Sequence, residues 1–353
     1  MKIKANLLNS EDYYFPESGE FIHLNLNESA YPVPDWIKEK IFARLKQADW
    51  HFYPSDNNRS LLSKLADYTG SRPESILLGN GSNELIQTVV YACCNSQEAI
   101  VTVRPGFSIY RKVAELMRIK VKEIPLQEDF GFDLEKILKA SKKARVILLG
   151  SPHNPTGQVL GPEQLEALLS GTRALVVVDE AYAEFSGQSS IPLISRFRNL
   201  IVLRTFSKAF RLAGGRFGYA VGEAGLIKAL KTARLPFSVG IFQQIAAEIL
   251  LDEKDFLQNE IQKTISERQR LVKALNQFKT FKPFPSRANF LFVVSTRLSA
   301  REIFQRLLNR RILIRIFSLP ELKNSFRITV GKPEENNRLL EGLQEIDKEA
   351  TDG

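Results

Sequence analysis

The sequence predicts an α/β fold in which a mostly parallel sheet is covered by helices. Apolar runs with strand-like composition, among them Ala99–Val103, Arg145–Gly150 and Ala174–Val178, alternate with helix-like segments. This alternation is typical of right-handed βαβ crossovers, which join parallel strands. A chain of 353 residues also exceeds the size at which a single hydrophobic core usually divides. We therefore expect two domains of unequal size.

Polar side chains follow three of the predicted strands. Asn154 comes shortly after the strand that ends at Gly150, Asp179 ends the next apolar run, and Lys208 follows the strand that ends near Thr205. In open α/β sheets the ligand crevice lies outside the carboxyl ends of the strands. The sequence therefore predicts that these three side chains share one site.

The sequence predicts few regular elements in the N-terminal part of the chain. Residues 1–35 are expected to form an extended arm, because prolines interrupt the segment. Asp35 is placed to cap a helix from Trp36 to Gln47. An aromatic, polar loop that contains Tyr53 then precedes a helix from Leu61 to Tyr68.

The run Ser75–Glu84 predicts a strand, a glycine turn and the start of a helix. The backbone N–H groups of Gly81, Ser82 and Asn83 would lie in the first turn, where oriented amides and the helix dipole bind phosphate. A dinucleotide-binding turn is the rival interpretation, but its Gly-x-Gly-x-x-Gly spacing is not completed here. A phosphate site is therefore predicted at this turn.

The last third of the chain differs in character from the rest. Longer helix-like segments precede shorter strands at Asn289–Val294 and Arg311–Ile316. This change indicates a second domain. We predict an arm over residues 1–35, a large domain over residues 36–240 and a small C-terminal domain over residues 241–353.

Lys208, Asp179 and Arg216 are the residues best suited to carry chemistry. An isolated lysine at a strand end is more often a surface residue, but desolvation lowers the pKa of a lysine toward the neutral amine that attacks carbonyl carbons. Arg216 follows two glycines and could bring its guanidinium fork to a phosphate. A buried Asp179 would need a cationic partner. The three together predict a site with a reactive lysine, a guanidinium suited to phosphate and a carboxylate that needs a cationic partner.

Composition excludes several classes of function. The net charge is +9, but basic residues are spread along the helices and do not form one stripe, which argues against nucleic-acid binding and favours an anionic small molecule. No run of 18 apolar residues exists, so no membrane span is expected. The first residues also lack the apolar core of a signal peptide, and we expect a cytoplasmic protein.

The cysteines and histidines argue against a metal site. Cys93 and Cys94 are adjacent, so a disulfide between them would be strained. His23, His51 and His153 are scattered along the chain. Two cysteines and three scattered histidines do not form a ligand set, and no metal is predicted.

Seven short motifs lie in order along nearly the whole chain: Tyr53-Pro54, Gly79–Glu84, Asn154–Gly157, Asp179–Phe185, Thr205–Phe210, Arg216–Tyr219 and Phe326–Gly331. In order and spacing they resemble those of the fold-type I pyridoxal-phosphate aminotransferases, and within them the histidinol-phosphate aminotransferases. The resemblance implies a large domain with a mostly parallel sheet between helices and a smaller α+β domain. The run Asn27–Pro34 differs from the family's usual sequence, and we assign no site residue there.

The resemblance also implies how the cofactor, pyridoxal 5′-phosphate, would be bound. It would be attached to Lys208, with its ring nitrogen paired to Asp179. Phe107, which stands where the family has a tyrosine, would stack on the ring. The ring oxygen would be held by Asn154 and Tyr182. The phosphate would be held by Ser207, Arg216, the amides of Gly81, Ser82 and Asn83, and the partner subunit's Tyr53.

The resemblance implies a substrate and an assembly as well. Arg327 matches the arginine that clamps a substrate carboxylate, and Arg315 stands in the place of one that helps to hold a substrate phosphate. A tyrosine that serves the partner's site implies a homodimer with shared active sites.

The activity expected from the resemblance is transamination between histidinol phosphate and glutamate or 2-oxoglutarate. Three alternatives stay open at this point: a decarboxylase similar to those that act on threonine phosphate, a general or aromatic amino-acid aminotransferase, and a non-catalytic binding module with the same fold. The presence of Lys208, Asp179 and Arg327 together argues against the last of these.

Overall fold

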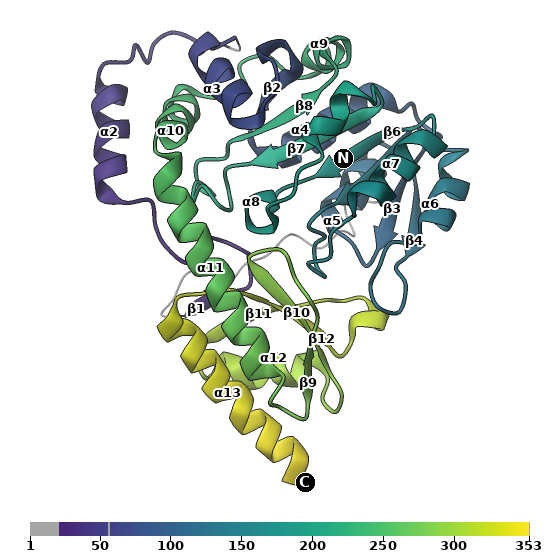
Figure 1. The fold of residues 1–353 in the computed structure, drawn as a ribbon, viewed down its shortest axis with the longest axis vertical. Coiled ribbons are helices and arrows are strands. Elements are labelled where there is room, and N and C mark those ends of the chain that lie inside the picture. Colours follow the sequence, from purple (N-terminus) through teal and green to yellow (C-terminus); the bar gives the residue numbers. More distant parts are fainter. Residues whose placement is uncertain (1–20, 56, 353) are drawn as a thin grey trace, which may run out of the picture.

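The computed structural model describes residues 21–55 and 57–352, which contain two separate sheets (Figure 1). We call the part built on the seven-stranded sheet the large domain and the part built on the five-stranded sheet the small domain. The large domain lies at the top of the view, and the small domain lies below it. The part of the predicted arm over residues 1–20 lies outside the described residues.

The large domain is built on a seven-stranded sheet with the order β2-β8-β7-β6-β5-β3-β4. Strand β8 is antiparallel to both of its neighbours, and the other adjacent pairs are parallel. The prediction of a mostly parallel sheet is therefore confirmed. The strands are β2 (Ile76–Gly79), β3 (Ala99–Arg104), β4 (Lys120–Pro125), β5 (Val146–Gly150), β6 (Leu175–Asp179), β7 (Leu200–Thr205) and β8 (Gly218–Gly222).

Helices cover both faces of this sheet because its central strands are apolar on both sides. In β5, Val146 and Leu148 join one core, whereas Ile147 and Leu149 join the other. The first core is closed by α4 (Gly81–Cys93), α5 (Ser108–Leu116) and α9 (Ala224–Ala233). The second is closed by α2 (Asp35–Lys46), α3 (Arg59–Thr69), α6 (Leu134–Ser141), α7 (Pro162–Gly171), the short α8 (Ala183–Ser186) and α10 (Ile241–Asp252).

The small domain has a five-stranded sheet with the order β1-β11-β12-β10-β9. Its strands are β1 (Ile22–Leu24), β9 (Phe281–Pro283), β10 (Phe290–Ser295), β11 (Ile312–Ile316) and β12 (Ser325–Thr329). Strand β1, from the N-terminal part of the chain, pairs in parallel with β11 at one edge. The helices α12 (Ala300–Asn309) and α13 (Pro333–Asp352) contribute to this second hydrophobic core.

Helix α11 (Lys254–Leu275) runs from one domain to the other (Figure 1). Its Leu257 packs in the large-domain core, whereas Leu271 and Leu275 pack in the small-domain core. Helix α10 packs against α2 and α3 on the large-domain side. The domain boundary after residue 240 stays a prediction, because one continuous helix belongs to both cores.

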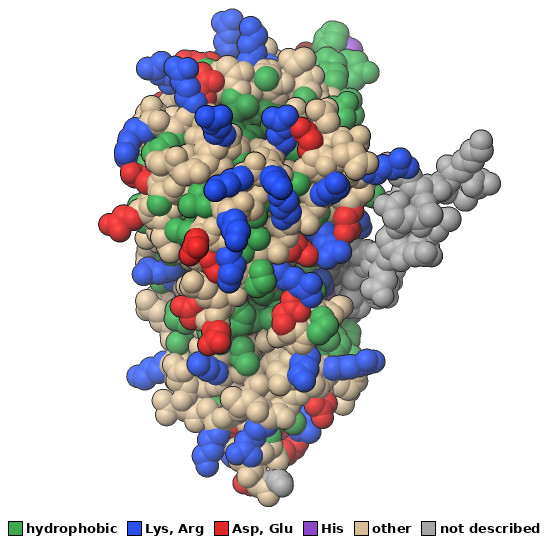
Figure 2. Space-filling view, turned by 90° about the vertical axis from the view of Figure 1, so that its right-hand side faces the viewer, with side chains coloured by type: hydrophobic (Ala, Val, Ile, Leu, Met, Phe, Trp, Pro, Cys, Tyr) green, Lys and Arg blue, Asp and Glu red, His purple; other side chains and the backbone are tan. Residues whose placement is uncertain are grey.

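Three further expectations can be compared with the structure. The cap predicted at Asp35 was wrong: Pro34 is the N-cap, and Asp35 is the first helical residue, paired with Lys38 at 2.9 Å. On the face shown in Figure 2, lysine and arginine side chains are dispersed among acidic and uncharged ones. Among the described helices, none has the length and apolar character needed to cross a membrane.

Candidate functional site

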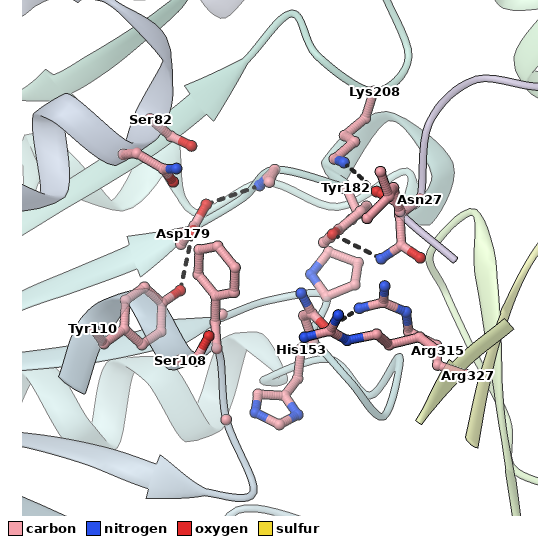
Figure 3. A pocket seen from close by; sticks show the side chains of 18 of the residues that line it. Asn27, Ser82, Ser108, Tyr110, His153, Asp179, Tyr182, Lys208, Arg315 and Arg327 are labelled. Atoms are coloured by element: carbon pink, nitrogen blue, oxygen red, sulfur yellow. Dashed lines mark hydrogen bonds between the residues drawn. The ribbon is translucent and has the colours of Figure 1, made fainter. Parts of the chain in front are cut away.

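A cavity of about 620 Å³ opens at the carboxyl ends of β5, β6 and β7, between the two domains (Figure 3). The large domain lines it with side chains from the strand ends, from α4 and from α5, and the small domain lines it with residues 315–319 and Arg327. The three polar side chains predicted to meet at the strand ends, Asn154, Asp179 and Lys208, all line this cavity.

Asp179 ends β6 and is buried. Its Oδ2 accepts a hydrogen bond from the Tyr110 hydroxyl at 2.9 Å, and its Oδ1 accepts one from the backbone N–H of Ala181 at 3.2 Å. Burial raises the pKa of this carboxyl to about 6, although both hydrogen bonds act in the opposite direction. A cation placed against Asp179 would stabilise the charged form.

Lys208 follows β7 in a half-buried position. Its Nζ donates to the backbone carbonyl of Leu26 at 3.0 Å. Burial lowers the pKa of Lys208 to about 8, and the positive charges of Arg327 and Arg216 act in the same direction. A neutral amine is therefore accessible near neutral pH, as nucleophilic attack on a carbonyl requires.

The N-terminus of α4, Ser207 and Arg216 together form an anion cradle. Arg216 Nη1 donates to Ser207 Oγ at 3.3 Å and to the carbonyl of Ala213 at 2.9 Å. Gly81 has a φ of +75°, and a Cβ at this position would lie only 2.8 Å from Arg216 Nη2. Glycine is therefore needed to bring the amides of α4 beside the guanidinium.

Tyr182 and Arg327 lie at the other side of the cavity (Figure 3), which Asn154 lines as well. The Tyr182 hydroxyl accepts from Nδ2 of Asn27 at 2.9 Å. The buried Arg327 donates from Nη1 to Oδ1 of Asn154 at 2.6 Å and from Nη2 to the carbonyl of Asn25 at 2.7 Å. The bond to Asn154 connects the small-domain strand β12 to the large domain, and the bond to Asn25 connects it to the segment after β1.

Arg315 and Arg327 lie directly opposite one another on the adjacent antiparallel strands β11 and β12. Both line the cavity. Side chains of directly opposed residues share a face of the sheet with Cβ atoms about 4.5–5.5 Å apart, and like charges in this arrangement are unfavourable. An anionic ligand in the cavity would relieve that repulsion.

The remaining predicted site residues divide into two groups. Ser82, Asn83, Phe107 and Ser207 line the cavity, and Gly81 lies immediately beside it through Arg216. Tyr53 does not line it: the side chain is 80% exposed and stacks on Phe237, with ring centroids 4.7 Å apart. Within one subunit, the structure therefore brings together all of these residues except Tyr53.

Sequence reasoning missed two residues of the site, Tyr110 and Asn27. Tyr110 lies one helical turn after Phe107, meets that ring edge to face at 5.4 Å and donates to Asp179. Its spacing of three residues from Phe107 was a signal for a shared helix face. For Asn27 no local signal exists, because its partners Tyr182 and Thr329 are 155 and 302 residues away.

Comparison with known proteins extends these observations to the whole chain. The family described as aminotransferase class I and II matches residues 20–343. The chain is 39% identical to histidinol-phosphate aminotransferase 1 of Carboxydothermus hydrogenoformans, over 92% of this chain and 93% of that protein. It is 37% identical to the histidinol-phosphate aminotransferase of Pyrococcus furiosus, over 99% of this chain and 100% of that protein. Among solved structures, it is similar to histidinol-phosphate aminotransferase from Sinorhizobium meliloti in complex with pyridoxal-5'-phosphate, with a TM-score of 0.86 and 27% identity, covering 93% of this chain and 91% of that one.

Proposed function

The chain belongs to the class I and II aminotransferases, which use pyridoxal 5′-phosphate as their cofactor, and we propose that it transfers an amino group between two small molecules. These are histidinol phosphate and 2-oxoglutarate. The names of its relatives support histidinol phosphate as a substrate, and transamination over both decarboxylation of a phosphorylated amino acid and general or aromatic transamination. A non-catalytic role is not supported, because the site retains the chemical groups that the reaction needs.

The residues of the cavity fit the cofactor. The glycine-shaped cradle of Gly81 and Arg216 suits a phosphate, since a side chain at Gly81 would displace the guanidinium. Asp179 is buried, and the two groups that donate hydrogen bonds to it, the Tyr110 hydroxyl and the Ala181 amide, are both neutral. The protonated ring nitrogen of the cofactor would supply the missing cation.

The cofactor supplies an electron sink for the substrate Cα–H bond. Lys208 would attach it covalently and then, as a free amine, move the proton to and from the substrate Cα. Asp179 would keep the ring nitrogen protonated, and Asn154 and Tyr182 would hold the ring oxygen. Phe107 would provide a flat apolar surface for the ring.

The opposed pair Arg315 and Arg327 is the observation that carries the substrate assignment. Glutamate has an α-carboxylate, for which the fork of Arg327 is suited. Histidinol phosphate has no carboxylate, so its phosphate must supply most of the anchoring, and Arg315 is the adjacent guanidinium. One cavity would thus accept both substrates in alternation.

We expect Arg315→Ala to lower kcat/KM for histidinol phosphate about ten- to a hundredfold, because a charge-assisted hydrogen bond contributes about 1.5–3 kcal/mol. The rate of the glutamate half-reaction, measured by single-turnover absorbance changes, should fall less. Arg327→Ala should slow the glutamate half-reaction more than the reaction of histidinol phosphate. Arg315→Lys is the matched control, since it keeps the charge but loses the fork and should recover only part of the loss.

Equal losses for both substrates in Arg315→Ala would contradict this assignment. So would the absence of histidinol-phosphate turnover by the wild-type enzyme. Release of carbon dioxide from a phosphorylated amino acid by the wild type would favour the decarboxylase instead.

A homodimer with shared active sites is the second part of the proposal. Tyr53 belongs to an exposed aromatic surface, which we define by Trp50, Phe52, Tyr53 and Phe237. The first three are close neighbours in the sequence, and Tyr53 stacks on Phe237. Exposed aromatic side chains gathered in this way mark protein interfaces. The exposure of Tyr53 and its absence from the lining of its own subunit's cavity support a role in the site of a second copy.

Mixing two variants should test this sharing. Tyr53→Ala and Lys208→Ala homodimers should each be weakly active or inactive, whereas subunit exchange creates one site that has both side chains. Part of the activity should then return, and size-exclusion chromatography should show dimers throughout. A fully active monomer would refute shared sites.

A cytoplasmic location is proposed as well. Cys93 and Cys94 are both free thiols, as is usual for proteins of a reducing compartment.

A further inference from the structure

We propose that Asn27 is a positioning residue, which orients the Tyr182 hydroxyl so that its proton is available to the ring oxygen of the cofactor. The inference rests on the proposed function in one respect, namely that Tyr182 faces that oxygen. It assigns a role to the run after β1, where the sequence indicated none.

Asn27 is held in a single conformation. It is 1% exposed and has a φ of +54°, in the left-handed region that asparagine tolerates better than most residues. Its carbonyl accepts from Nδ2 of Asn289 at 3.1 Å. A buried residue with these constraints has little freedom to turn its side chain away from Tyr182.

The hydrogen bonds of Thr329 determine which end of the Asn27 amide faces Tyr182. Thr329 Oγ1 accepts from the backbone N–H of Asn27 at 2.9 Å. Its own proton goes to Oδ1 of Asn27, at 3.3 Å. Oδ1 is therefore turned to Thr329, and Nδ2 donates to Tyr182 at 2.9 Å.

The hydrogen bond that Asn27 Nδ2 donates to Tyr182 determines the direction of the Tyr182 hydroxyl proton. A tyrosine hydroxyl has one proton and can also accept. Because its oxygen accepts from Asn27, the proton is directed to another acceptor, and the accepted bond makes the hydroxyl a stronger donor. A donor to the ring oxygen stabilises the deprotonated form of that oxygen.

Asn27 also connects this hydroxyl to the residues that bind substrate. Thr329 lies two residues after Arg327 on β12, so the two side chains share a face of the strand. The carbonyl of Asn25 accepts from Arg327, and that of Leu26 accepts from Lys208. The segment 25–27 therefore contacts the small-domain strand β12 and the large-domain residues Lys208 and Tyr182.

The test is a pH titration of the visible absorbance of the loaded enzyme, without any amine or oxo acid. In Asn27→Ala the pH at the midpoint of this absorbance change should rise by about 0.5–1 pH unit. A shift of this size corresponds to the free energy of one neutral hydrogen bond. Asn27→Asp, which keeps the shape, should raise the midpoint at least as much, because a carboxylate would accept the Tyr182 proton. Asn27→Ala leaves unchanged the charged side chains that act on Lys208, namely Glu28, Asp179, Arg216 and Arg327. Asn27→Asp adds a carboxylate, whose negative charge also raises the midpoint.

A double-mutant cycle separates positioning from a general structural role. If Asn27 acts through the Tyr182 hydroxyl, adding Asn27→Ala to the Tyr182→Phe variant should not raise the midpoint of the absorbance titration any further. Equal rises in both backgrounds would overturn the proposal, as would an unchanged midpoint in both single Asn27 variants. Failure to turn over histidinol phosphate would bear on the proposed function alone, since the titration uses no substrate.

Discussion

Lys208→Ala should lose the covalent link to the cofactor, and its turnover should fall by at least about 10²–10⁴-fold, the range expected for loss of a general acid–base group. The residue is the only lysine among those that line the cavity in the described part of the chain. Borohydride treatment of the wild-type enzyme, followed by peptide mass spectrometry, should label Lys208. The same treatment of the variant should label no residue.

Lys208→Arg is the matched control, because it keeps a positive charge that cannot be deprotonated in a protein. It should be as inactive as the alanine variant. In the wild type, covalent capture of added cofactor should become faster as pH rises toward about 8, since burial lowers the pKa of Lys208 to about 8 and only the neutral amine attacks. Labelling of another lysine would contradict the assignment.

Asp179→Asn should separate activity from stability. Turnover should fall about 10²–10³-fold, because the charge that stabilises the protonated ring nitrogen is lost. The asparagine keeps the shape, and Tyr110 still has a partner for its hydroxyl. Steady-state kinetics with saturating cofactor would measure the loss.

The stability of the cofactor-free protein should change in the opposite direction. Burial raises the pKa of Asp179 from 3.8 to about 6, so the folded chain holds this proton more tightly than the unfolded chain does. Stability is therefore lost as pH rises from about 4 to about 6. At pH 7 the Asp179→Asn variant should gain up to about 3 kcal/mol of unfolding free energy over the wild type, and the gain should vanish below about pH 4. An equal stability of both proteins at pH 7, measured by denaturant unfolding, would contradict the burial argument.

The parts of the site that could be predicted are those that follow from local sequence. Asp179 and Lys208 each follow an apolar run, and parallel strands bring such ends to one edge of a sheet. The glycine turn at Gly81 also has a local signature, namely a strand, a glycine and a helix start. For these residues the order of elements was sufficient.

The parts that could not be predicted depend on register and on contacts between distant segments. The sequence separates Arg315 from Arg327 by twelve residues, and only the pairing of β11 with β12 places them opposite one another. A shift of one residue would have turned one of them to the other face. Asn27 was missed for a related reason, since its role depends on a strand made near the other end of the chain.

The pairing of β1 with β11 has a consequence for biosynthesis. Residues 22–24 are translated almost 290 residues before Ile312–Ile316, so the first described strand has no partner until β11 has been translated. Closing so long a loop is entropically unfavourable and slow. The segment 25–27 that follows β1 reaches Lys208, Tyr182 and Arg327 only after this late pairing, so the enzyme should assemble its cofactor site after translation of both domains and not on the nascent large domain.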